Sequence, residues 1–147
     1  MNDSARKTLE AAGHLVLRVS VSLLFLFGHG WAKLAGWAEK SATFPDPLHV
    51  GSRLSFALVI FAEVVCSALV AAGLLTRLAA VPPVIMMFVA FFVQHAADPF
   101  ARRELAMLYG LAFVAILLLG PGEWSLDGLL RRRREGRKGK ESSRIKL

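Results

Sequence analysis

The sequence predicts an all-α fold, a bundle of four transmembrane helices with both termini on the same, cytoplasmic side. Four apolar stretches fill about half of the 147 residues, 55% of the residues are hydrophobic, and the mean hydropathy is +0.51. Soluble domains usually have roughly 45 to 50% apolar residues. None of the stretches has the polar face that a water-exposed helix requires, which argues against a soluble four-helix bundle. We therefore expect one membrane domain over residues 1–130, in contact with the lipid bilayer.

The first apolar stretch, residues 15–31, ends in a glycine-rich segment and is longer than the core of a signal peptide. We expect it to stay attached as the first helix, beginning near Thr8. The second stretch, residues 54–75, is long enough to span the hydrocarbon of a bilayer, which takes roughly 20 helical residues. The loop between the two contains Pro45 and Pro47, which prevent a regular helix.

The third and fourth stretches, residues 78–93 and 105–119, are shorter and need flanking residues to complete a span. Because only a few residues around Thr76 link the second and third stretches, we expect a tight antiparallel hairpin there. Pro82-Pro83 falls near the start of the third helix, where missing amide donors are tolerated best. Asp98-Pro99 predicts the next turn, and Gly120-Pro121-Gly122 predicts a sharp end of the fourth helix.

The net charge of +7 lies in the C-terminal tail, residues 131–147, which holds nine basic and two acidic residues. We expect this tail to be disordered, to stay in the cytoplasm and to touch anionic lipid headgroups, and we do not expect it to bind nucleic acid. The same charge bias predicts that both termini lie in the cytoplasm. The four apolar stretches predict a multi-pass protein, which we expect in the cell inner (plasma) membrane. The single cysteine, Cys66, excludes a disulfide within the chain and a thiol relay built on a CxxC pair.

Several ionisable residues lie inside or at the ends of the apolar stretches, where a charge costs on the order of 2.5 kcal/mol or more. At about 1.5 Å of rise per residue, five of them are expected in the outer half of the membrane: His29, Lys33, Glu63, His95 and Glu104. Arg18 precedes His29 by about three helical turns and is expected on the same face of the first helix. The candidate catalytic residues are Glu63, His29 and His95. The candidate substrate-binding residues are Arg18, Lys33 and Glu104.

A buried carboxylate beside a histidine and a basic residue is a usable proton acceptor and hydrogen-bonding set for a quinone ring or a small anion. The same residues could instead form a salt-bridge network that fixes helix packing, and this alternative stays open. Haem ligation by two histidines is not expected, because both lie near the outer edge and no second pair exists. The histidines and Glu104 lack a metal-ligand spacing on one element, so no metal is expected either.

As a set, these residues resemble the DoxX family of small four-helix membrane proteins. The resemblance covers about residues 15–130, and its matching segments are HGWAKL at 29–34, Glu63, GLLTRLAA at 73–80, Met87 with Ala90 and His95, and GPGEWSLD at 120–127. It implies a relation to the membrane subunit of thiosulfate:quinone oxidoreductase and an association with quinone-linked redox complexes. Arg77 and Asp127 are family-pattern positions, and we expect them to form a structural ion pair at the cytoplasmic interface. Where the family often has glycines after the glutamate of the second helix, this chain has VVCS at 64–67.

Three functions remain open at this point. The first is a quinone-associated membrane subunit of a redox complex; if it is enzymatic, it is part of a quinone-linked oxidoreductase with a redox partner protein. The second is a non-enzymatic scaffold whose tail recruits soluble redox enzymes. The third is a small proton-coupled exporter, against which the biased charge of the tail argues. Small residues such as Gly28 and Ala68 allow close helix contacts, which leaves a homo-oligomer open.

Overall fold

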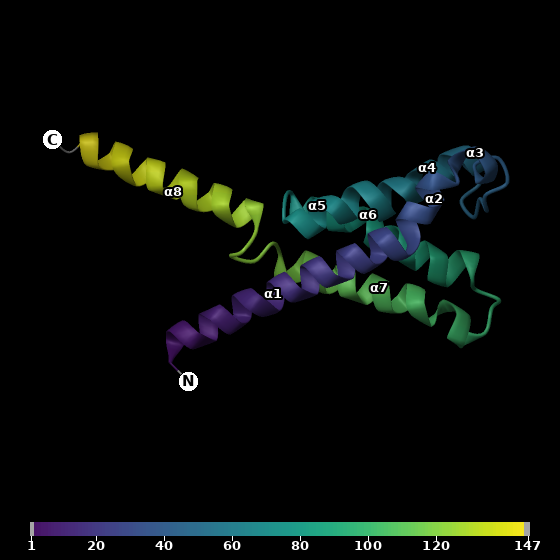
Figure 1. The fold of residues 1–147 in the computed structure, drawn as a ribbon, viewed down its shortest axis with the longest axis horizontal. Coiled ribbons are helices and arrows are strands. Elements are labelled where there is room, and N and C mark those ends of the chain that lie inside the picture. The colour runs from purple at the N-terminus through teal and green to yellow at the C-terminus, as the bar shows by residue number, and fades with distance from the viewer. Residues whose placement is uncertain (1, 146–147) are drawn as a thin grey trace.

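The computed structural model describes the backbone of residues 2–145 and the side chains of residues 2–137, and every regular element in this range is helical. Four long helical segments pack side by side, and both termini lie at the same end of the bundle (Figure 1). We call this end the terminal end. The opposite end, where the long loop between the first two segments lies, is called the loop end.

The first segment consists of α1 (Asp3–Phe25), the π-helical turn η1 (Leu26–Gly30) and α2 (Trp31–Ala35). It starts five residues before the expected Thr8, because the side chain of Asn2 accepts a hydrogen bond from the amide of Ala5 and caps the first turn. A short helix, α3 (Trp37–Lys40), follows.

The second and third segments form the expected antiparallel hairpin. The second is α4 (Ser52–Ile60), η2 (Phe61–Cys66) and α5 (Ser67–Ala72), and the third is α6 (Thr76–Val89) and η3 (Ala90–Gln94). The turn between them is tight because Gly73 adopts a left-handed conformation with φ of 72° and closes the end of α5. Pro82 and Pro83 lie inside α6, about two turns from its start.

The fourth segment, α7 (Phe100–Leu119), starts after Pro99 and ends at Gly120, whose φ of 83° stops the helix as the sequence predicts. It packs most extensively against α6. The side chains that fill the core between the segments come from α1, α5, α6 and α7, and include Phe25, Val70, Ala80, Phe113 and Ile116.

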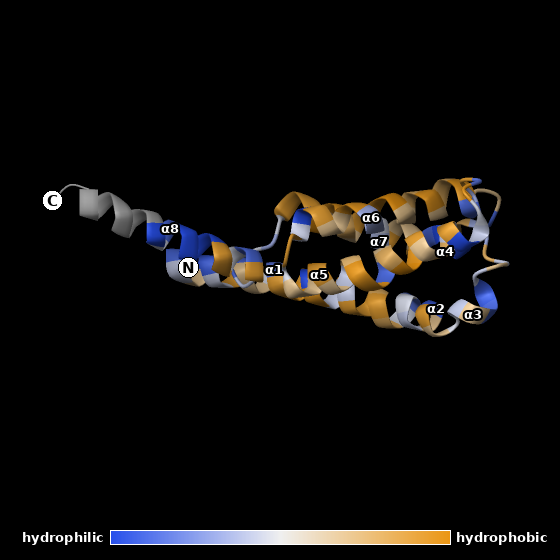
Figure 2. Cartoon of the chain, turned by 90° about the horizontal axis from the view of Figure 1, so that it is seen from above, coloured by the Kyte–Doolittle hydropathy of each residue, from blue (hydrophilic) through white to orange (hydrophobic). Residues whose placement is uncertain are grey.

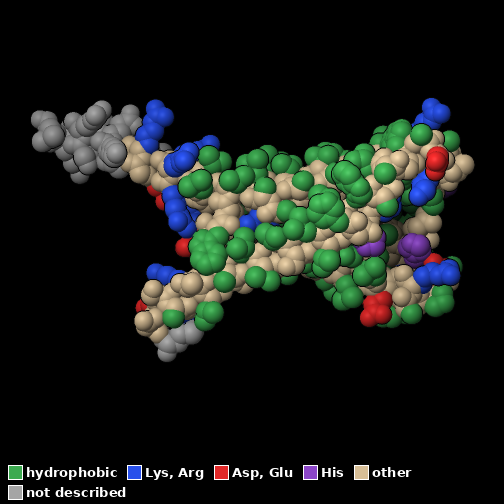
Figure 3. Space-filling view, viewed as in Figure 1, with side chains coloured by type: hydrophobic (Ala, Val, Ile, Leu, Met, Phe, Trp, Pro, Cys, Tyr) green, Lys and Arg blue, Asp and Glu red, His purple; other side chains and the backbone are tan. Residues whose placement is uncertain are grey.

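Three segments are long and apolar enough to cross a membrane: Asp3–Ala35, Ser52–Ala72 and Thr76–Gln94. The fourth, α7, is not among them, because Arg102, Arg103 and Glu104 near its start leave only residues 105–119 uncharged. The surface of the bundle is nevertheless apolar over its length (Figures 2 and 3). Large side chains that are at least 60% exposed are spread over it: Leu9, Val16, Leu24, Phe27, Leu78, Phe92 and Leu118.

A cluster of polar contacts holds the terminal end together. Arg18 is 2% exposed and donates to the carbonyl of Val70 at 2.8 Å, to the carbonyl of Ala71 and to the carbonyl of Trp124 at 2.9 Å. Asp127 accepts hydrogen bonds of 2.9 Å from the amides of Leu75 and Thr76 and from the hydroxyl of Thr76. Arg18 connects α1 to α5 and to the linker at residues 120–125, and Asp127 connects α8 (Leu126–Ile145) to the start of α6.

One expectation about this end needs correction. Asp127 does not pair with Arg77 within the described side chains, because its two oxygens cap the start of α6, while Arg77 donates to the carbonyl of Leu118 at 3.3 Å. The described part of the basic tail, up to Ile145, belongs to α8. Arginine and lysine are good helix formers. The carboxylate of Asp127 in the first turn also stabilises α8, because a negative charge interacts favourably with the positive end of the helix dipole.

We predict that Gly73→Ala destabilises the protein. A side chain at a left-handed position costs on the order of 1–2 kcal/mol, and a Cβ at Gly73 would lie 2.5 Å from Cβ of Ser125 and 2.8 Å from Nη1 of Arg18. Thermal unfolding of the full chain in detergent should show a lower midpoint. Gly13→Ala is the matched control, because a Cβ at this helical glycine meets nothing within 4 Å. Equal midpoints for both variants would contradict the prediction.

We also predict an acid-sensitive contribution from Asp127. Burial raises the pKa of this carboxyl, but the hydrogen bonds from Thr76 and Leu75 outweigh burial and hold the pKa below its usual range. A lowered folded-state pKa stabilises the protein above the unfolded-state value, about 3.9, and this stabilisation is lost as the pH falls through the folded-state pKa. The difference in melting midpoint between the wild type and Asp127→Asn should therefore shrink from about pH 5 to about pH 3. A difference that stays constant over this range would argue against this role.

Candidate functional site

The polar residues of the loop end meet around one cavity of about 620 Å³. All three π-helical turns contribute to its wall, through His29 of η1, Glu63 of η2 and Gln94 of η3. π-helical turns are rare and are often found at functional sites, where they redirect side chains. The wall is otherwise largely apolar, and Figure 3 shows histidine side chains beside a hollow at this end of the molecule.

Glu63 is the most buried ionisable residue of the cavity. It is 2% exposed, and its Oε1 accepts a hydrogen bond of 2.5 Å from Nζ of Lys33, with which it forms an ion pair between the first and second segments. Its Oε2 is buried and has no hydrogen-bond partner among the described residues. A buried acceptor without a partner costs about 1–3 kcal/mol. The cavity is therefore lined by a carboxylate that has one oxygen without a hydrogen-bond partner among the described residues.

The close approach of η1 to η2 depends on Gly30. A Cβ at this position would lie 2.8 Å from Cγ2 of Val64 and 3.0 Å from Cβ of Glu63, so only glycine lets the two turns meet this closely. The VVCS segment after Glu63 does not prevent the contact, because the glycine is supplied by the first segment. The contact brings Lys33, three residues later, within reach of Glu63.

One wall of the cavity is aromatic. The ring of His29 lies 5.4 Å from that of Tyr109 in an edge-to-face arrangement and 5.8 Å from that of Phe25, and Phe25 lies 4.8 Å from Tyr109. All three residues line the cavity. Aromatic rings at such distances and tilted or edge-to-face angles attract one another, so this wall is an aromatic cluster.

His95 lies where the third segment ends. Its Nδ1 is 2.7 Å from Oδ2 of Asp98, and Asp98 also pairs with Arg102 at 3.6 Å. The hydrogen bond with His95 and the charge of Arg102 lower the pKa of Asp98. Because Nδ1 is engaged by the carboxylate, Nε2 is the nitrogen of His95 that remains for a ligand.

The loop between α3 and α4 covers part of the cavity. Phe44 lines the cavity and packs on Phe56 with ring centroids 4.6 Å apart. Asp46 fixes this loop, since it accepts hydrogen bonds of 2.6 Å from the amide of Gly51 and from the hydroxyl of Ser55. The hydrogen bond from Ser55 is the main reason that the pKa of Asp46 is lowered.

The structure brings four of the six candidate site residues to the cavity: Glu63, His29, His95 and Lys33. Glu104 does not line it, although the next residue, Leu105, does. Arg18 lies at the terminal end, because the eleven residues between it and His29 correspond to about 16 Å along a helix. Its bonds to backbone carbonyls make it a structural residue of that end.

Four polar lining residues were not predicted from the sequence: Ser55, Tyr109, Gln94 and Arg102. Tyr109 offered a signal, because it is the single tyrosine of the chain and lies inside an apolar stretch. Gln94 and Arg102 flank the turn at 95–99 and have no sequence pattern that separates them from ordinary polar residues at a helix end. Among the described residues, no group of three His, Cys, Asp or Glu side chains could hold a metal ion.

The fold and the cavity together define a class, a small polytopic helical membrane protein with a polar-lined cavity at one end of the bundle. The family model described as DoxX matches residues 13–96, and the chain belongs to the DoxX family. The uncharacterized membrane protein Rv3486 of Mycobacterium tuberculosis (strain ATCC 25618 / H37Rv) is 35% identical over 144 residues, which cover 81% of this chain and 82% of that protein. No solved structure matches the chain significantly.

We predict that Lys33→Met destabilises the fold, because it leaves the buried carboxylate of Glu63 without its charged partner. Removing one member of a buried ion pair typically costs about 3–5 kcal/mol, whereas replacing both members costs much less. Thermal unfolding should give a lower midpoint for Lys33→Met and a partial recovery for Lys33→Met/Glu63→Gln. Lys40→Met, at an exposed position of α3, serves as the control. A double variant no more stable than Lys33→Met would show that the pair is not coupled.

Proposed function

We propose that this protein binds a quinone or quinol in the cavity at the loop end and acts as a quinone-associated membrane subunit of a redox complex. The observation that carries the proposal is that Glu63 lines a largely apolar cavity while its buried Oε2 has no hydrogen-bond partner among the described residues. A volume of about 620 Å³ lies within the usual range of ligand sites, roughly 300–1,000 Å³.

The cavity supplies both kinds of hydrogen-bonding group that the two redox forms need. Oε2 of Glu63 can accept the hydroxyl hydrogen of a quinol, and the ammonium group of Lys33 and the hydroxyl of Tyr109 can donate to the carbonyl oxygens of a quinone. Carboxylates and histidines are common proton acceptors, so Glu63, His29 and His95 are the groups we assign to proton exchange.

The surroundings of the cavity suit a lipid-soluble ligand. Lining residues from the second, third and fourth segments are also among the exposed apolar side chains: Leu58, Phe61, Ile85 and Leu105. A ligand can therefore keep an apolar tail along the outside of the bundle while its ring occupies the cavity. Phe25 and Tyr109 offer aromatic surfaces against which a flat ring can stack.

The proposal includes the membrane arrangement. We place four spans in the inner (plasma) membrane, with α7 as the fourth, and both termini in the cytoplasm, supported by the nine basic residues of segment 131–147. The cavity then opens near the outer face. Electrons would be exchanged between the quinone and a partner redox protein.

A non-enzymatic scaffold is the second candidate, and the ion pair of Lys33 and Glu63 favours it, because this pair also ties two segments together. In that case Glu63 serves helix packing alone. Quinone binding by wild-type protein and by Glu63 variants separates the two functions.

We predict that a short-chain benzoquinone quenches tryptophan fluorescence of the detergent-solubilised full chain in a saturable manner. Trp37 is a suitable reporter, since it stacks on Phe56 at 5.5 Å, next to Phe44 of the cavity wall. Loss of a hydrogen bond to a charged group costs about 1.5–3 kcal/mol, so Glu63→Gln should weaken binding by at least about tenfold. Glu104→Gln makes the same chemical change outside the cavity and should bind as the wild type does.

Quenching that rises linearly without saturation in folded wild-type protein would overturn the quinone site. Equal binding by Glu63→Gln and Glu104→Gln would remove Glu63 from it. The scaffold function predicts the first of these results, together with a lower melting midpoint for Glu63→Gln.

A further inference from the structure

A second hollow, also of about 620 Å³, lies at the terminal end, between the α5–α6 turn and the start of α8. It is independent of the cavity described above. Its apolar side is formed by Leu74, Leu75 and Leu130, and its basic side by Arg131, Arg134 and Arg137. A space with leucines on one side and guanidinium groups on the other matches a molecule with an apolar body and an anionic head.

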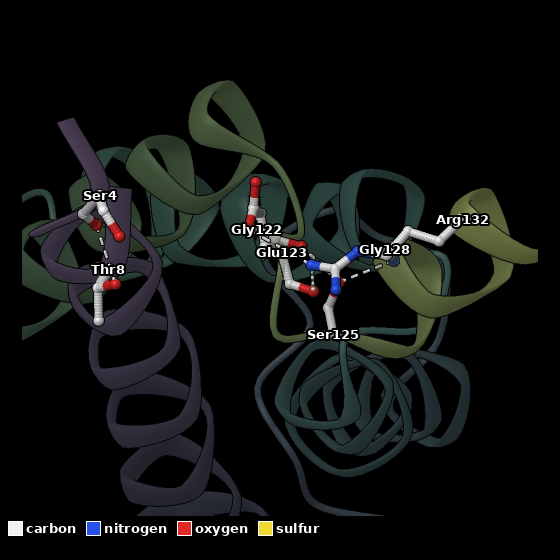
Figure 4. A network of polar contacts seen from close by, with 7 residues as sticks. All are labelled: Ser4, Thr8, Gly122, Glu123, Ser125, Gly128 and Arg132. Carbon is white, nitrogen blue, oxygen red and sulfur yellow. Dashed lines mark hydrogen bonds and ion pairs between the residues drawn. The ribbon is translucent and has the colours of Figure 1, made fainter. Parts of the chain in front are cut away.

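The orientation of the arginines supports this match. Residues three apart share a face of a helix, so Arg131 and Arg134 act together on the side that lines the hollow. Arg132 does not line it, because it turns back to the linker, where its Nη2 lies 3.3 Å from the carbonyl of Glu123 and 3.4 Å from Oε2 of the same residue (Figure 4).

The positive charges of the three arginines that line the hollow are available to bind a ligand. Two carboxylates also line it, those of Asp127 and Glu135. Asp127 is already occupied by hydrogen bonds from Leu75 and Thr76. Within residues 2–137, no carboxylate lies within ion-pair distance of the three lining arginines.

The hollow also lies at the boundary between the apolar and the charged surface. Leu78 of α6 is 69% exposed and Trp124 of the linker is 48% exposed, and each is three residues from a lining residue, Leu75 and Asp127 respectively. Figure 2 shows the apolar colour of the bundle changing to the hydrophilic colour along the beginning of α8. This is where the headgroups of a bilayer meet a membrane protein, and arginines near anionic headgroups are attracted to them.

We propose that this hollow is a binding site for one anionic phospholipid, with its phosphate on Arg131 and Arg134 and its acyl chains along Leu74 and Leu75. The site ties the first turns of α8 to the membrane surface through a bound lipid. It is distinct from a diffuse attraction of the basic tail, because it assigns the contact to two arginines on one face.

Native mass spectrometry of the full chain in detergent tests the site, with phosphatidylglycerol and phosphatidylcholine of identical acyl chains as probes. We expect the wild type to retain phosphatidylglycerol in preference to phosphatidylcholine. Arg131→Gln/Arg134→Gln should lower the affinity for phosphatidylglycerol about tenfold or more. Arg132→Gln/Arg133→Gln removes the same charge from the same helix and should keep the wild-type preference.

An equal loss of preference in both double variants would overturn the site, because it would show a general effect of tail charge. No loss in Arg131→Gln/Arg134→Gln would overturn it as well. So would an RNA oligonucleotide that binds through Arg131 and Arg134 and displaces the lipid. Melting midpoints of the variants in phosphatidylcholine show whether each is folded, and Arg131→Lys/Arg134→Lys, which keeps the charge, should retain part of the preference.

Discussion

The architecture depends on satisfying the backbone carbonyls that are left open where α5 ends. In an apolar solvent such groups must find partners inside the protein. Arg18 reaches the carbonyls of Val70 and Ala71 from α1 and holds that of Trp124 with its other terminal nitrogen. It can do so only because residue 73 is a glycine, since a Cβ there would lie 2.8 Å from Nη1. A buried charge, expensive by itself, thereby connects α1, α5 and the linker that leads to α8.

The two ends of the bundle use their polar residues differently. At the terminal end, Asp127 accepts three hydrogen bonds, from Leu75 and from both donors of Thr76. At the loop end, Glu63 is 2% exposed and so more buried than Asp127, yet within the described residues one of its oxygens has a partner and the other has none. Helix packing explains the first arrangement completely. It explains only half of the second, because the ion pair with Lys33 uses Oε1 alone. Oε2 keeps the free-energy cost of a buried acceptor without a partner, which a hydrogen bond from a bound ligand would remove.

The position of a residue along the bundle could be predicted from the sequence more reliably than the direction in which its side chain points around the helix axis. Rise per residue is nearly constant, so the sequence alone assigns His29, Lys33, Glu63 and His95 to one end of the bundle. Predictions that needed the rotation or the partner of a side chain were less successful. The expected pairing of Arg77 and Asp127 is one example, since both residues are at the predicted depth but bind different groups.

The π-helical turns explain why the directions of these side chains could not be predicted from the sequence. Each such turn accommodates an extra residue, which turns the following helix by about 100° relative to a regular continuation but changes its length by only about 1.5 Å. Lys33 follows η1, so its direction toward Glu63 depends on a feature that no hydrophobic pattern records. Glu63 lies within η2, and Gln94 closes η3. The same irregularity that hid the rotation of these residues from the sequence is therefore what aims them into one cavity.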